Sequence, residues 1–180
     1  MSTANDRAVL NMILNPLLPN EPFDPNGNPY PADPCENLPK FSECRELEKI
    51  GIHLAEEEKF DEAIEKFNAA IEICPANPHP YNNRAQAYRL QNKIEEALSD
   101  LNKSIELSNS EGKAAQAAFT QRAMIYLLKE EKDKAKADFQ KAAELGSSFA
   151  KMQLVAMNPY AAMCNQMLSE VVGKLQRGEE

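Results

Sequence analysis

The chain lacks several features that mark common classes of protein. It has 180 residues, with no tryptophan and only 6 glycines. No GxSxG, P-loop, HExxH or glycine-rich fingerprint occurs, so we expect no catalytic residues and no enzyme activity. No apolar run approaches the ~20 residues that a membrane span needs. The first residues lack the basic region, the long apolar stretch and the cleavage site of a secretory leader. We therefore expect a soluble cytoplasmic protein that does not bind membranes.

Positive charge is also scarce. The formal net charge is -8, and no basic stripe occurs along the chain. A surface of this sign repels phosphate backbones, so binding to nucleic acid is not expected.

The cysteines and histidines do not form a metal motif. The four cysteines contain no CxxC pair, and no Cys, Asp or Glu stands at metal-ligand spacing from His53 or His79. We expect free, buried thiols in a reducing compartment, with no metal and no cofactor. The cysteines are Cys35, Cys44, Cys74 and Cys164.

What the chain does contain is an internal repeat. One stretch recurs after 34 residues and again, less closely, after a further 38, as the positions of Ala63, Ala97 and Ala135 show. In each copy a small residue on a second helix would let a first helix approach, and a large residue four positions later would fill the space. The recurring sites are Gly51, Ala85 and Ala123; Leu54, Tyr88 and Tyr126; Ala63, Ala97 and Ala135; Phe67, Leu101 and Phe139; and Ala70, Ser104 and Ala142.

Apolar periodicity and breaking residues predict six helices in three pairs. Their expected ranges are 41–57 and 60–73, 78–91 and 94–107, and 112–129 and 132–145. Before them we expect an amphipathic helix within residues 1–15 and a linker at 16–40, where 8 of the 12 prolines lie. After them we expect capping helices at 150–176 and a short tail at 177–180.

The repeat resembles the tetratricopeptide repeat in its period and in its small and large sites. The resemblance implies an all-α, right-handed superhelical stack of three helix-turn-helix pairs with a C-terminal capping helix. The three units would span about 44–77, 78–111 and 116–149. Stacks of this kind usually bind other proteins, so we expect a monomeric adaptor.

Three further segments narrow the resemblance. The segments NDRAVLNMILNP, YNNRAQAYRLQ and MNPYAAMCNQML are similar to a small three-repeat family, that of tetratricopeptide repeat protein 36. This resemblance implies a co-chaperone-like role, with an Hsp70-type chaperone as partner and a client enzyme, a dioxygenase of tyrosine catabolism, protected from degradation. It also implies an alternative, a structural or assembly role in cilium biogenesis.

The first helices of the pairs are expected to line a binding groove. The candidate partner-binding residues on them are Lys49, Asn82, Asn83, Gln86, Arg89 and Gln121. Chaperone-binding relatives clamp a C-terminal carboxylate with Lys and Asn, then Asn, then Lys and Arg. Only Asn83 matches that set, because the other four positions hold Glu48, Ile52, Ala117 and Gln121. A carboxylate needs cationic or convergent N–H donors to replace its water, so we expect no tight grip on a free chaperone tail.

Overall fold

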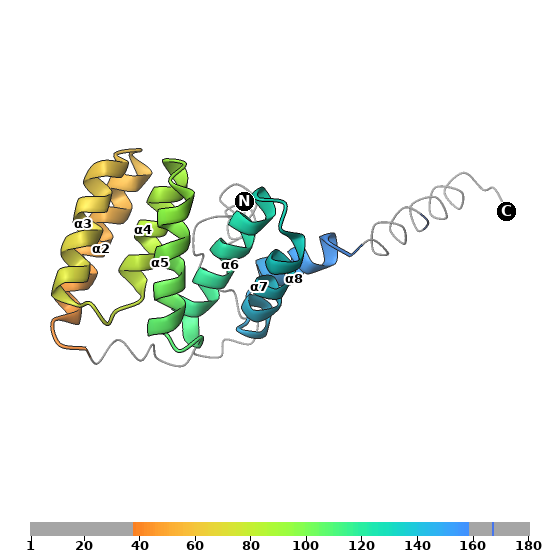
Figure 1. Cartoon of the computed structure of the whole chain (residues 1–180). Helices are drawn as coiled ribbons and strands as arrows, with labels where there is room; N and C mark the ends of the chain where they lie inside the picture. The colour runs from red at the N-terminus through yellow and green to blue at the C-terminus, as the bar shows by residue number, and fades with distance from the viewer. Residues whose placement is uncertain (1–37, 159–166, 168–180) are drawn as a thin grey trace, which may run out of the picture.

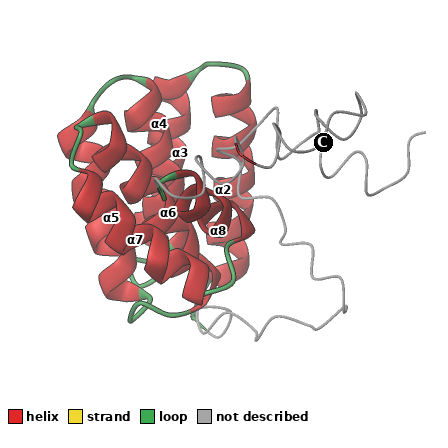
Figure 2. Cartoon of the chain, turned by 90° about the vertical axis from the view of Figure 1, so that its right-hand side faces the viewer, coloured by secondary structure: helices red, strands yellow, loops and turns green. Residues whose placement is uncertain are grey.

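A computed structural model describes residues 38–158 and residue 167. The described part of the chain is helical, with no strand (Figures 1 and 2). In chain order the helices are α2 (Phe41–Glu56), α3 (Phe60–Ile73), α4 (His79–Leu90), α5 (Ile94–Leu107), α6 (Gly112–Leu128), α7 (Lys132–Glu144) and α8 (Ser148–Ala156). The six predicted repeat helices are confirmed, each to within one residue at either end. The predicted N-terminal helix, most of the linker and the long final helix lie outside the described residues.

The helices form three antiparallel pairs that follow one another along the stack (Figure 1). Helix α2 packs on α3, α4 on α5 and α6 on α7, and consecutive pairs meet through α3 with α4 and α5 with α6. Helix α8 covers α7, where the ring of Phe149 meets that of Phe139 edge-on with centroids 6.3 Å apart. All-α packing of this kind confirms the predicted stack.

Each pair is closed by the same turn. The amide N–H groups of Lys59, Lys93 and Glu131 donate to the carbonyl oxygens five residues earlier, at 2.9, 2.8 and 2.8 Å. The residue before each donor has a positive φ of about 60°, as the six-to-one hydrogen bond that ends a helix requires. The turn therefore reverses the chain in the same way three times.

The core consists of the small and large sites that the repeat predicted. The second-helix residues Ala63, Phe67, Ala97, Leu101, Ala135 and Phe139 are all completely buried. The closest approach is in the first pair, because a Cβ added at Gly51 would lie 2.5 Å from Cε1 of Phe67. The absence of a side chain at Gly51 thus makes room for a fully buried ring.

A repeated polar contact joins consecutive pairs. Arg84 on α4 donates from Nε and Nη2 to both carboxylate oxygens of Asp100 on α5, at 2.7 and 2.6 Å, and from Nη1 to Asn68 on α3. Arg122 repeats this arrangement one unit later, with Asp138 on α7 and Asn102 on α5. A bidentate guanidinium–carboxylate pair fixes orientation as well as distance. Each arginine therefore ties its own pair to the one before it.

Replacing Gly51 by alanine should destabilise the protein although alanine favours a helix. Steric crowding against Phe67 costs ~1–3 kcal/mol, which outweighs the helix-propensity gain of at most ~1 kcal/mol. The loss should shrink in a Phe67→Leu background, which imitates Ala85 facing Leu101 in the second pair. Urea unfolding of the four proteins measures this double-mutant cycle. An equal cost of Gly51→Ala in both backgrounds would contradict the assigned contact.

Candidate functional site

Helices α2, α4 and α6 are the first helices of their pairs, and together they carry all six predicted binding residues. We call this surface the A-helix face. Two hydrogen bonds fix its order: Asn83 Nδ2 donates to Glu48 Oε2 on α2 at 3.3 Å, and Asn82 Nδ2 donates to the carbonyl oxygen of Ala114 on α6 at 2.8 Å. Helix α4 therefore lies between α2 and α6, and its side chains face both neighbours.

On the α2 side, Glu48 is the centre of a buried polar network. Its side chain is 8% exposed, and its Oε1 accepts hydrogen bonds from Asn77 Nδ2 at 2.9 Å and from the Cys44 thiol at 3.3 Å. Asn77 also contacts the sulfur of Cys44 at 3.2 Å, and its Oδ1 accepts from the N–H of His79 at the start of α4. One carboxylate therefore joins α2 to the loop before α4 and, through Asn83, to α4 itself.

The network also shifts the protonation of its members. Burial raises the pKa of Glu48 above its ordinary value of 4.5, although charges at His79 and Arg45 and the hydrogen bonds from Cys44 and Asn77 act the other way. Burial raises the pKa of the Cys44 thiol to about 12, so this thiol stays protonated and can donate to Glu48. It is not the reactive thiolate that a catalytic cysteine needs.

Asn83, a candidate partner-binding residue, donates from its Nδ2 to Glu48 in the structure. The Glu48 carboxylate thus already accepts a hydrogen bond from Asn83, the one residue that matches the clamp of chaperone-binding relatives. A second carboxylate brought to the same place would meet both a donor in use and a negative charge. This geometry agrees with the expectation that the chain does not clamp a free C-terminus.

The other predicted residues differ in their surroundings. Lys49 is exposed and pairs with Glu46 on its own helix at 2.7 Å, and Gln86 is partly buried. Asn82 and Gln121 are only 3% and 8% exposed. Each has a buried side-chain oxygen without a hydrogen-bond partner among the described residues, and Arg89 has a buried Nη2 in the same condition. Binding by these six residues stays a prediction.

Sequence reasoning missed two members of the Glu48 network, Asn77 and Cys44. Asn77 stands in a proline-rich turn, PANPHP, where asparagine is common for local reasons. Nothing in the local sequence indicates that its amide reaches back to α2, 29 residues earlier.

The described residues contain neither a metal cluster nor a membrane-spanning helix. No group of three or more His, Cys, Asp or Glu side chains there could hold a metal ion. None of the described helices has the length and apolar character of a membrane span. Cys44 and Cys74 are buried and free, and the other two cysteines lie outside this part of the chain.

Replacing Glu48 by glutamine should change how stability depends on pH. Because the folded-state pKa of Glu48 lies above its unfolded value, its stabilising contribution is full below the unfolded pKa and is lost as pH rises through the folded pKa. The free energy of unfolding of the wild type relative to Glu48→Gln should therefore fall with rising pH, by at most ~1.4 kcal/mol per pH unit. Urea unfolding at about pH 5 and about pH 7.5 measures the difference.

Glu46→Gln is the matched control, because it removes an exposed carboxylate from the same helix. A pH dependence shared by both variants would report only the loss of a negative charge, and would show that burial of Glu48 has no such effect.

Known proteins match the chain along its whole length. A TPR repeat profile matches residues 53–91, and a tetratricopeptide repeat profile matches residues 78–111 and 116–146. Tetratricopeptide repeat protein 36 of Caenorhabditis elegans is 57% identical over 180 residues, covering 100% of both chains. The Homo sapiens protein of that name is 40% identical, with 98% of this chain and 97% of the human one covered.

Among solved structures, the second TPR domain of human RPAP3 in complex with the HSP70 peptide SGPTIEEVD is similar. It is 30% identical with a TM-score of 0.53, and the match covers 60% of this chain and 88% of that one. With the relatives that match over their full length, the three helix pairs show that this chain belongs to the tetratricopeptide repeat protein 36 family.

Proposed function

We propose that the protein is a non-enzymatic adaptor that binds an Hsp70-type chaperone, stabilises a client protein such as a metabolic enzyme, or does both. The observation that carries this proposal is on the A-helix face. Buried polar atoms of Asn82, Arg89 and Gln121 have no partner within the described residues. Buried polar groups are almost always hydrogen-bonded in native proteins, so unpaired groups gathered on one face support the proposal that a partner completes this surface.

The similar RPAP3 domain supports a chaperone as one partner, because it was solved with a peptide of HSP70. The two sequences are 30% identical, so the likeness supports a shared kind of partner as well as a shared fold. The mode of binding we propose is different from a carboxylate clamp. Glu48 and Asn83 form a pair within the protein, so an anionic C-terminus brought to that end of the A-helix face would meet the Glu48 carboxylate.

The absence of a reactive group among the described residues supports an adaptor rather than an enzyme. The Cys44 thiol lies beside the Glu48 carboxylate, but burial raises its pKa to about 12, so it stays protonated at neutral pH and is not an activated nucleophile. We further propose that the protein acts as a cytoplasmic monomer.

Binding to a full-length Hsp70-type chaperone should not require its free C-terminal carboxylate. Isothermal calorimetry would compare the native chaperone with a version extended by two alanine residues, which moves the carboxylate and removes nothing else. We expect dissociation constants that agree within about threefold. The second TPR domain of human RPAP3 is the control for binding to the native tail.

Two results would count against the proposal. If the extended chaperone did not bind while the native one did, binding would require the free C-terminal carboxylate, contrary to the proposed mode. If neither chaperone bound, the chaperone would not be a partner. A stoichiometric complex with cytoskeletal components recovered from cells, with no chaperone in it, would favour the assembly role instead.

A further inference from the structure

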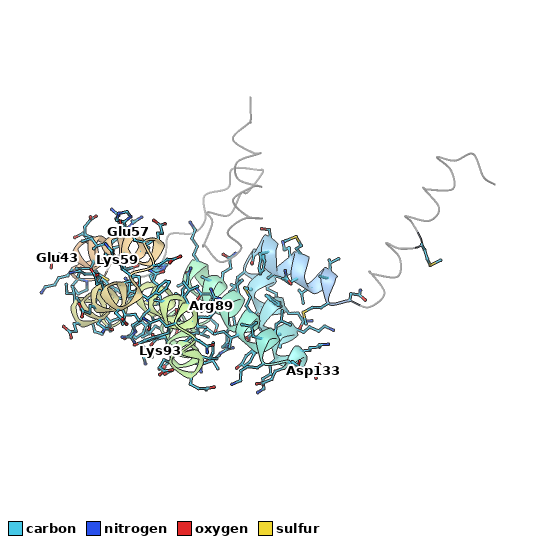
Figure 3. All side chains as sticks on the ribbon, turned by 90° about the horizontal axis from the view of Figure 1, so that it is seen from above. Glu43, Glu57, Lys59, Arg89, Lys93 and Asp133 are labelled. Carbon is cyan, nitrogen blue, oxygen red and sulfur yellow. The ribbon has the colours of Figure 1, made fainter. Side chains whose placement is uncertain are left out.

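Arg89 is a cation that has no anionic partner among the described residues. It lies on α4, seven residues after Asn82 and therefore on nearly the same side of the helix. Its side chain is partly buried, and its Nη2 is enclosed with no hydrogen-bond acceptor among the residues that the structure describes. Figure 3 labels Arg89 near the middle of the stack, whereas Glu57 and Lys59 lie at the first pair and Asp133 at the third.

Two other arginines show what a structural arginine looks like in this protein. Arg84 and Arg122 each hold a bidentate carboxylate and a neighbouring asparagine. Arg89 has no such partner, and desolvation is the single cause that lowers its pKa, with no acidic group acting on it. A cation taken partly out of water without an anion lowers stability. The fold therefore gives no reason for an arginine at this position.

Unpaired acceptors accompany this unpaired donor. Asn82 Oδ1 and Gln121 Oε1 are buried and have no hydrogen-bond partner among the described residues. Because Asn82 contacts Ala114 and the first helices of successive pairs run in the same direction, position 89 lies level with the α6 residue seven after Ala114. That residue is Gln121. The three side chains thus share one strip between α4 and α6.

The strip has the donors and acceptors that an acidic peptide requires. A guanidinium binds a carboxylate through two parallel N–H groups, and the Arg89 side chain as a whole is only partly buried. Its Nη2 and the amide oxygens of Asn82 and Gln121 are enclosed in the free protein, so a peptide contacts them only after these side chains turn outward. We propose that Arg89, flanked by Asn82 and Gln121, is the subsite for an acidic side chain, Asp or Glu, within an extended segment of a partner protein. This inference rests on the proposed adaptor function and names the ligand chemistry of its A-helix face.

The charges on the face favour this occupant over a terminal carboxylate. Glu48 lies on the α2 side and uses Asn83, whereas the unpaired cation lies on the α6 side, toward the end of α4. An internal aspartate or glutamate can reach Arg89 from any point of a segment that passes over the face. Binding at Arg89 therefore does not require a terminal carboxylate.

The test uses the nonapeptide SGPTIEEVD with a free and with an amidated C-terminus, and the amidated peptide with both glutamates replaced by glutamine and the aspartate by asparagine. Each is titrated to about 1 mM into the ¹⁵N-labelled full chain while the side-chain N–H signals of arginine, asparagine and glutamine are recorded. The glutamate peptide should shift the Arg89 Nε–Hε and Gln121 Nε2 signals. The glutamine peptide should bind about tenfold more weakly, because a hydrogen bond to a charged group is lost.

Variants separate a binding role from a structural one. Arg89→Met should abolish the response to the glutamate peptide without lowering the melting temperature, and Arg89→Lys should restore part of it. Lys103→Met is the matched control, since it removes an exposed cation from α5 and should change neither. Arg84→Met should lower the melting temperature, because Arg84 holds Asp100.

Four results would overturn the subsite. The first two are equal affinity for the glutamate and glutamine peptides, and binding only when the peptide's C-terminus is free. The other two are wild-type affinity of Arg89→Met for the glutamate peptide, and no shift of the Arg89 signal at the highest peptide concentration. A melting temperature lowered by Arg89→Met as much as by Arg84→Met would also show a structural role. None of these depends on the chaperone calorimetry, so the adaptor function and this subsite can fail separately.

Discussion

The close approach of the two helices within each pair is the constraint on which the rest of the structure depends. A small residue on each helix, such as Gly51 or Ala63, lets the axes come together, and a large residue such as Phe67 fills the remaining space. Once this distance is set three times, the first helices lie side by side on one face. The positions of Glu48, Asn83 and Arg89 on that face follow from this packing and from the turn that closes each pair.

Polar contacts then join the pairs, and an arginine–asparagine contact repeats at both joins, Arg84 with Asn68 and Arg122 with Asn102. The second and third units use the arginine fork, but the first unit has Ile50 and Lys66 at the equivalent positions. Its link to the second unit depends on Asn68 meeting Arg84 and on the Glu48–Asn77 network. The network therefore holds α2 against α4 at positions where chaperone-binding relatives hold the ligand's carboxylate.

Buried polar groups on this face divide into satisfied and unsatisfied ones, and the division separates fold from function. Glu48, Asn77 and Asn83 complete one another, so changes there should act on stability first. Asn82, Arg89 and Gln121 retain unpaired atoms that the described fold does not use. Under the proposed adaptor function, these groups lower the stability of the free protein and gain their hydrogen bonds when a partner binds.

The sequence by itself determined the helices, their pairing and the core. Period, small and large sites and breaking residues act locally or between adjacent helices, so Ala97 and Leu101 could be placed in the core from spacing alone. Only the tertiary structure decided the state of the binding face. Asn83 meets Glu48, and Arg89 meets no anion in the part of the chain that the structure describes. Both outcomes depend on which side chains meet across α2, α4 and α6. Contacts between residues about 30 positions apart leave no local pattern, since a helix surface amide has the same neighbours in sequence whether it is paired or free.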